Sequence, residues 1–192
     1  MPSWLETLMD DAADWASGRW WLPRLPLLAY LAYAFWHHFR DPDYSSFLFG
    51  AVTFGVHELG HVVFSPFGEF LGFAGGSIAQ FLAPLAAGLG FLFWQREGEP
   101  QRDYFAFAVA GSWLSFSLYN LATYIGDARR QLLPLLGLSS DPQHDWAYLL
   151  GHLGLLQHDL KIAGMVRLAA FASGVLSLLF GAWLLKKMAS SS

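Results

Sequence analysis

Apolar residues fill five long stretches of this chain, and breaks that contain polar residues or proline separate them. The stretches cover residues 20–39, 44–67, 70–94, 104–125 and 162–185. A helix needs about 20 mostly apolar residues to cross the hydrocarbon core of a bilayer. The pattern therefore predicts an all-α fold: a polytopic membrane helical bundle with about five transmembrane segments in a single membrane domain, residues 20–187.

Two parts of the chain lie outside these stretches. In residues 1–19, apolar positions such as Trp4, Leu8 and Trp15 recur at helical spacing among acidic residues. The spacing predicts an amphipathic N-terminal helix, which lies either on the membrane interface or against the rest of the protein. Residues 126–161 are more polar and predict a loop with a short helix.

The third stretch is the least regular, because Gly75, Gly76 and Pro84 interrupt it. Irregular backbone is tolerated at membrane depth only where it faces protein or a wet cavity. The stretch therefore predicts either a broken or re-entrant segment beside the second stretch, or close helix packing through small residues.

The composition supports a membrane protein and limits its partners. Hydrophobic residues make up 55% of the chain and charged residues 14%, whereas soluble domains carry about 25% charged residues. The net charge is −4 and no basic tract stands out, so we expect no nucleic-acid partner. We expect an integral, multi-pass protein of a cell or inner membrane, in contact with the lipid bilayer. Because cysteine is absent, any metal ion must be held by His, Asp, Glu or neutral oxygen and nitrogen groups.

The second stretch contains the sequence His57-Glu58-Leu59-Gly60-His61. Two histidines four residues apart lie on one face of a helix, one turn apart, so both imidazoles can reach one ion. Glu58 lies at the edge of that face and can reach a water molecule at the metal without being a ligand. Ionisable groups inside an apolar stretch are costly and are by default functional. The alternative is a pair of core histidines with ordinary hydrogen bonds and a Glu58 that is paired elsewhere.

A hydrophobic helix with this motif, followed by the small-residue segment 75–80, resembles the site-2 protease family of intramembrane zinc metalloproteases. The resemblance covers about residues 50–90. It implies a bound Zn²⁺ with His57 and His61 as ligands, Glu58 as general base, and a transmembrane protein or peptide as substrate. Members of the family take the third ligand from an Asp in a later membrane segment, usually in an Asp-Gly pair, which this chain lacks.

Catalytic zinc typically takes three protein ligands. The resemblance does not identify the third one in this chain, so we look for it in the remaining sequence. The candidates gather in residues 126–161, which emerge on the side of the membrane where the second stretch ends. Asp145 is the preferred ligand, since it precedes an apolar run as an Asp at the start of a helix would; alternatively, it only caps that helix. His144 is the next candidate, as a ligand or as a partner that orients one, and Asp127 and His152 follow.

Other polar residues lie in or beside the apolar stretches. Asn120 and Gln80 are candidates for substrate binding, although interhelical hydrogen bonds would explain both residues as well. His37 and His38 lie at the end of the first stretch and are expected to be surface histidines at the membrane boundary, with metal binding as the less favoured alternative.

Three functions fit these features. The first is an intramembrane zinc metalloprotease that hydrolyses peptide bonds of membrane-embedded substrates, with Glu58 as its catalytic base. The second is a non-catalytic, metal-binding accessory subunit of a membrane complex, which the small size of the chain suits. The third is a histidine-rich membrane di-iron oxidase, which is disfavoured because only His57 and His61 have suitable helical spacing.

Overall fold

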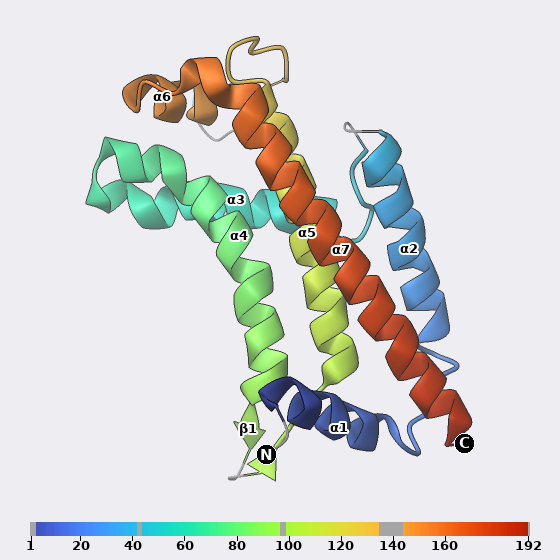
Figure 1. The fold of residues 1–192 in the computed structure, drawn as a ribbon. Coiled ribbons are helices and arrows are strands. Elements are labelled where there is room, and N and C mark those ends of the chain that lie inside the picture. The colour runs from blue at the N-terminus through green and yellow to red at the C-terminus, as the bar shows by residue number, and fades with distance from the viewer. Residues whose placement is uncertain (1–2, 42–43, 97–98, 135–143, 192) are drawn as a thin grey trace.

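A computed structural model describes residues 3–41, 44–96, 99–134 and 144–191 of the chain (Figure 1). The described residues are almost entirely helical. The helices are α1 (Trp4–Ala16), α2 (Leu25–Arg40), α3 (Gly50–Phe64), α4 (Glu69–Phe93), α5 (Tyr104–Gly126), α6 (Asp145–His152) and α7 (Asp159–Ser190). Single 3₁₀ turns, η1 (Ser65–Phe67) and η2 (Leu156–His158), precede α4 and α7. The all-α prediction is confirmed for the described residues, while residues 1–2 of the predicted N-terminal helix and 135–143 of the predicted loop lie outside them.

One short antiparallel ladder interrupts the helical pattern. Strands β1 (Gln95–Arg96) and β2 (Glu99–Pro100) pair between α4 and α5, with Gln95 opposite Pro100. The ladder occupies the polar break between the third and fourth apolar stretches. The chain thus reverses direction there, and α5 starts where the Asp103 carboxylate accepts a hydrogen bond from the Ala106 N–H.

Three of the described helices are long and apolar enough to cross a membrane, namely α4, α5 and α7. In Figure 1 the longer part of α4 runs alongside α5 and α7, and α2 runs beside α7. Five spans were predicted, whereas the described residues contain three helices of spanning length, which correspond to the stretches 70–94, 104–125 and 162–185.

The predicted second span differs most from the structure. α3 has 15 residues, which at 1.5 Å per residue is about 22 Å and less than the roughly 30 Å of a bilayer core. It lies across the long helices instead of along them (Figure 1). The apolar run continues beyond α3, but Pro66 lies in η1 and Gly68, with a φ of 106°, redirects the chain into α4.

The first part of α4 packs on α3 through small residues. A Cβ atom on Gly60 of α3 would collide with the Gly75 carbonyl, and one on Gly75 would lie 2.5 Å from the Gly60 carbonyl oxygen. α4 then bends toward α5 (Figure 1). Pro84 inside the helix has no N–H for the Gln80 carbonyl, which accounts for the bend. The third apolar stretch is thus one continuous, bent helix, and close packing explains its glycines.

α5 forms the centre of the bundle and contacts α4, α7 and α2. Its buried face includes Leu118 and Ile125, which pack with Leu150 and Ala163. The outer surface is apolar as well: Leu168, Leu176 and Leu179 of α7 are each more than 60% exposed, and similar side chains lie on α4. Soluble monomers rarely expose apolar patches of that kind.

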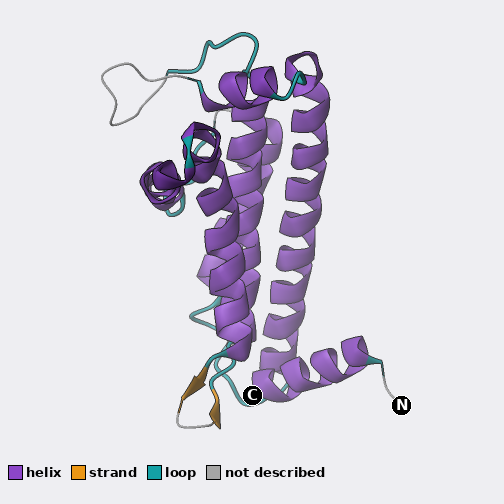
Figure 2. Cartoon of the chain, turned by 90° about the vertical axis from the view of Figure 1, so that its left-hand side faces the viewer, coloured by secondary structure: helices purple, strands orange, loops and turns teal. Residues whose placement is uncertain are grey.

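α1 closes one end of the bundle. It starts with a capping box between Ser3 and Glu6, and Ala12 and Ala16 are fully buried in a cluster with Tyr104 and Met188. Figure 2 shows α1 lying crosswise at the end where α7 finishes. α1 thus packs against the rest of the protein, which is one of the two positions predicted for it.

Candidate metal centre

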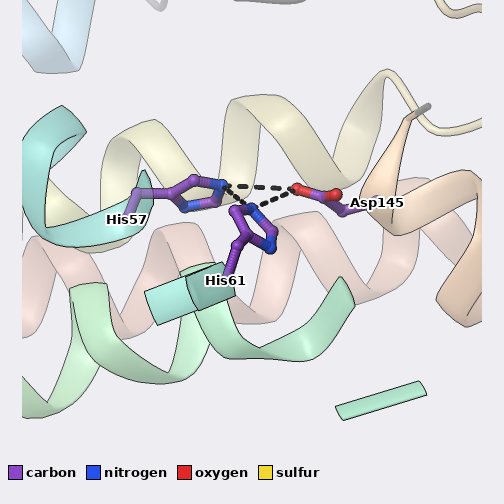
Figure 3. A group of neighbouring side chains, drawn as sticks. All are labelled: His57, His61 and Asp145. Atoms are coloured by element: carbon purple, nitrogen blue, oxygen red, sulfur yellow. Dashed lines mark hydrogen bonds and ion pairs between the residues drawn. The ribbon is translucent and has the colours of Figure 1, made fainter. Parts of the chain in front are cut away.

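Two elements from distant parts of the sequence bring three potential ligand atoms together. α3 presents His57 and His61 on one face, and the first residue of α6 presents Asp145 (Figure 3). Asp145 Oδ2 lies 3.3 Å from His57 Nε2 and 3.3 Å from His61 Nε2, and the two Nε2 atoms are 3.0 Å apart. These three residues could hold a metal ion.

The size of this triangle agrees with the coordination shell of one ion. With bonds of 2.0–2.1 Å, the ligand atoms of a tetrahedral ion are about 3.3 Å apart. An octahedral ion with similar bonds would place adjacent ligands about 2.9 Å apart. The three measured separations of 3.0–3.3 Å lie between these two values, so the triangle has the size of the coordination shell of a single ion.

The tautomer of His57 follows from the partner of Nδ1, the ring nitrogen that faces away from Asp145. Nδ1 lies 2.9 Å from Oε1 of Gln80, which is an acceptor and can only receive a hydrogen bond. Nδ1 therefore carries the proton of the neutral ring, and Nε2 directs a lone pair at the other ligands. Metal-ligating histidines commonly have a hydrogen bond of this kind on the opposite nitrogen.

His61 has the same arrangement with a different partner. Its Nδ1 lies 2.8 Å from the backbone carbonyl oxygen of Gly72 in α4, so Nδ1 again donates. When both rings are neutral, the two Nε2 atoms and the Asp145 carboxylate oxygen point lone pairs at one spot. Three converging acceptors repel one another unless a proton or a metal cation lies between them, so the arrangement is suited to binding a cation.

Asp145 is held at this spot by the start of α6 and by α5. Its backbone N–H donates to the Tyr124 hydroxyl at 3.1 Å. The neighbouring Trp146 donates its indole N–H to Ser77 of α4. Burial alone would raise the pKa of the Asp145 carboxyl, but hydrogen bonds from His57 and His61, when either ring is protonated, outweigh burial and leave that pKa below its ordinary value. A metal cation in place of those protons would likewise favour the ionised carboxylate.

Gly76 of α4 provides the space into which the two imidazoles point. A Cβ atom at this position would lie 2.5 Å from His61 Nε2 and 2.6 Å from His57 Nε2. Any side chain larger than hydrogen would therefore press on the two ligand atoms themselves. The glycine is required by this contact and not by its backbone conformation, which is helical.

Glu58 is half-buried next to the ligands in α3. Within the described part of the chain, its carboxylate has no hydrogen-bond or ion-pair partner. The alternative in which Glu58 is paired elsewhere thus finds no support among the described residues. A carboxylate without such a partner is available to accept a proton from a water molecule.

The other predicted ligands lie outside the triangle. His144 caps α6, because its Nδ1 accepts a hydrogen bond from the Ala147 N–H, and its Nε2 faces the Asp127 carboxylate at 3.4 Å without a well-aligned hydrogen bond. Burial lowers the pKa of His144 despite that carboxylate. Asp127 accepts hydrogen bonds from the backbone of Leu132 and Leu133. His152 is exposed, with its ring near Phe70 and Tyr148.

Gln80 and Asn120, the predicted substrate-binding candidates, form a hydrogen bond with each other. Gln80 Nε2 donates to Asn120 Oδ1 at 3.1 Å and to the Ser117 carbonyl oxygen at 2.9 Å. The interhelical hydrogen bonds considered from the sequence are therefore present between α4 and α5. Sequence reasoning missed the contact of Gln80 with His57 as well as the roles of Gly72 and Tyr124, because these depend on how α4 and α5 pack on α3.

Comparison with known proteins assigns no family to the chain: no family model matches it, and no curated protein or solved structure is significantly similar.

Proposed function

We propose that this chain is an integral, multi-pass membrane protein that binds one Zn²⁺ through His57, His61 and Asp145 and hydrolyses peptide bonds of membrane-embedded substrates. The observation that carries the proposal is the convergence of three lone-pair atoms at separations of 3.0–3.3 Å. Two imidazoles and one carboxylate with a fourth position left open match the ligand set of catalytic zinc sites.

The choice of zinc rests on geometry and ligand type. Imidazole nitrogen suits zinc, copper, iron and nickel, whereas magnesium and calcium favour sites made of oxygen ligands. Separations of 3.0–3.3 Å suit an ion with bonds of 2.0–2.1 Å to nitrogen and oxygen, as zinc has. The described residues contain one cluster of three such ligands, which supports a single ion better than a di-iron centre.

The residues around the site divide the work of hydrolysis. A bound zinc ion would supply Lewis acidity, both to acidify a water molecule and to polarise the scissile carbonyl. Glu58 would take the proton from the attacking water and then deliver it to the leaving amine. His57, His61 and Asp145 would hold the ion. A substrate helix would have to unwind locally, since its carbonyl must leave its helical hydrogen bond to be attacked.

The surroundings of the site fit a location within a membrane. α3 exposes Leu59, Val62 and Val63 by more than half of their surface; Leu59 lies between the two histidines, and the two valines follow the second one. Exposing such apolar side chains to lipid costs no free energy, whereas exposing them to water is unfavourable. We propose that α3 lies embedded in the bilayer without crossing it and that α4, α5 and α7 cross it.

A cleavage assay on the purified protein tests the proposal. The wild type, reconstituted in liposomes with zinc, would be incubated with a library of labelled transmembrane peptides, beside Glu58→Gln and the matched control Glu69→Gln from the first turn of α4. We expect Glu58→Gln to keep its zinc and lose cleavage by about 10²- to 10⁴-fold, while Glu69→Gln keeps both. Zinc binding without any cleavage by the wild type would contradict the protease and favour the accessory subunit.

A further inference from the structure

Gln80 is a buried polar residue at the point where α3, α4 and α5 meet. Its side chain is 2% exposed and lies in α4, four residues before the proline that bends this helix. It has three hydrogen-bond partners: His57 on α3, and Ser117 and Asn120 on α5. A neutral amide in this position is costly unless its hydrogen bonds are satisfied in one definite arrangement.

The partners on α5 determine which way the amide of Gln80 faces. The Ser117 partner is a backbone carbonyl oxygen, 2.9 Å away, and can only accept a hydrogen bond. The amide nitrogen must therefore face α5, and the Asn120 oxygen at 3.1 Å strengthens this preference. Rotating the amide by half a turn would place its oxygen against two other oxygens. The oxygen of Gln80 consequently faces His57 and has only its lone pairs to offer.

We propose that Gln80 is a positioning residue that holds His57 in the tautomer able to bind the metal. Because Gln80 can only accept from Nδ1, the Nδ1–H tautomer is selected and the Nε2 lone pair is kept on the ligand side. The same hydrogen bond fixes the plane of the ring. The inference rests on the proposed metal site, and it assigns to α5, which supplies none of the three ligand atoms, a role in metal binding.

The primary test measures zinc affinity and the visible spectrum of the Co²⁺-substituted protein, both on the full chain in detergent. Gln80→Leu keeps the approximate volume and removes the acceptor. We expect it to weaken zinc binding by about 10- to 100-fold, the range typical for partners of metal-ligating histidines. The Co²⁺ absorption bands should also shift, because the His57 ring is no longer fixed.

Gln80→Glu provides the rescue. A glutamate at this position still presents an oxygen acceptor to His57. The two oxygens of α5 favour its protonated form, which donates to Ser117 as the amide does. We expect zinc affinity and the Co²⁺ spectrum close to those of the wild type. If Gln80 acted only by filling space between helices, Gln80→Glu would bind zinc no better than Gln80→Leu, and the inference would be overturned.

A matched control separates positioning from general stability. Ser115→Ala in α5 also removes a buried interhelical hydrogen bond, from its hydroxyl to the Ala170 carbonyl, but it has no link to His57. It should leave zinc affinity and the Co²⁺ spectrum unchanged. If Gln80→Leu fails to fold, Asn120→Ala replaces it, and a few-fold loss of affinity is expected because Ser117 still orients the amide.

The outcomes distinguish this inference from the function on which it rests. A wild-type protein that binds no zinc would reject the metal centre itself. A wild type that binds zinc, with Gln80→Leu or its replacement Asn120→Ala equal to it in affinity and Co²⁺ spectrum, would reject only the role of Gln80.

Discussion

The chain contains two histidine clusters in apolar helices, one in α2 and one in α3. The two clusters differ in the groups that lie near the Nε2 atoms of their rings. In α2, His38 is 6% exposed, donates Nδ1–H to the Ala34 carbonyl of its own helix, and stacks on Phe116 with ring centroids 4.8 Å apart. In α3, His57 and His61 donate Nδ1–H to groups on a different helix. Both clusters thus fix the tautomer, and this feature alone does not indicate a metal site.

The surroundings of Nε2 make the difference. The His38 ring is enclosed by aromatic rings, with Tyr44 at its edge and Tyr119 nearby. The Nε2 atoms of α3 converge on each other and on a carboxylate from α6. A buried histidine in an aromatic setting is a core residue, whereas two imidazoles and a carboxylate that converge on one spot could hold a metal ion. The prediction that His38 is a surface residue was wrong, because Phe116 of α5 and Tyr44 cover it.

Replacing one histidine from each cluster should give the largest contrast. His57→Ala removes a ligand and should weaken zinc binding by more than about 100-fold, beyond the range seen for outer partners of ligands. His38→Ala should bind zinc as the wild type does and instead lower the melting temperature, because it leaves a cavity among aromatic rings. Competition with a chelator and thermal unfolding would measure both effects. Equal losses of zinc affinity in the two variants would remove the distinction between the clusters.

Filling the space in front of the ligands should have the next largest effect. Gly76→Ala places a methyl group 2.5–2.6 Å from both Nε2 atoms, so the rings must move apart. We expect zinc affinity to fall by about 10- to 100-fold, comparable to the loss of an orienting partner. Gly90→Ala is the matched control in the same helix, since its new Cβ would meet nothing within 4 Å. Similar affinity losses in both variants would indicate helix packing as the cause.

Removing a hydrogen bond that holds Asp145 in place should have the smallest effect on zinc affinity. Tyr124→Phe removes the hydroxyl that accepts the Asp145 N–H. A single hydrogen bond contributes about 0.5–1.5 kcal/mol, so zinc affinity should fall by roughly 2- to 12-fold. Tyr30→Phe, which loses a hydrogen bond to Ser46 near the other cluster, serves as the control. The contribution of Tyr124 would be refuted if its removal left the affinity at the control value.

The helices could be predicted from the sequence where local signals mark their ends. The third and fourth apolar stretches, 70–94 and 104–125, match α4 and α5 to within one residue at each end. The polar run between them and the Asp103 cap are visible in the sequence. The direction of α3 could not be predicted, because an apolar run indicates burial or lipid contact but not how a helix is oriented. Pro66 indicates only a local break in the helix, and does not tell where the chain turns afterwards.

The candidate metal site was predictable only where local sequence signals mark its residues. Helical spacing brings His57 and His61 together, and Asp145 was recognisable as an acid at the start of an apolar helix. The prediction that residues 126–161 reach the motif assumed that the second stretch crosses the membrane, whereas α3 lies crosswise and α6 reaches it through contacts with α4. The partners Gln80, Gly72 and Gly76 come from α4, and no local pattern specifies which of its faces meets α3.

Metal analysis of the purified protein tests the central claim most directly, because the claim is that three lone pairs share one cation. The wild type and Asp145→Ala, loaded with zinc in detergent and then dialysed, would be compared by elemental analysis. The account predicts about one zinc ion per wild-type chain and close to none in Asp145→Ala, since a catalytic-type site needs its third protein ligand. A wild type without zinc, or an Asp145→Ala variant that retains as much zinc as the wild type, would contradict it.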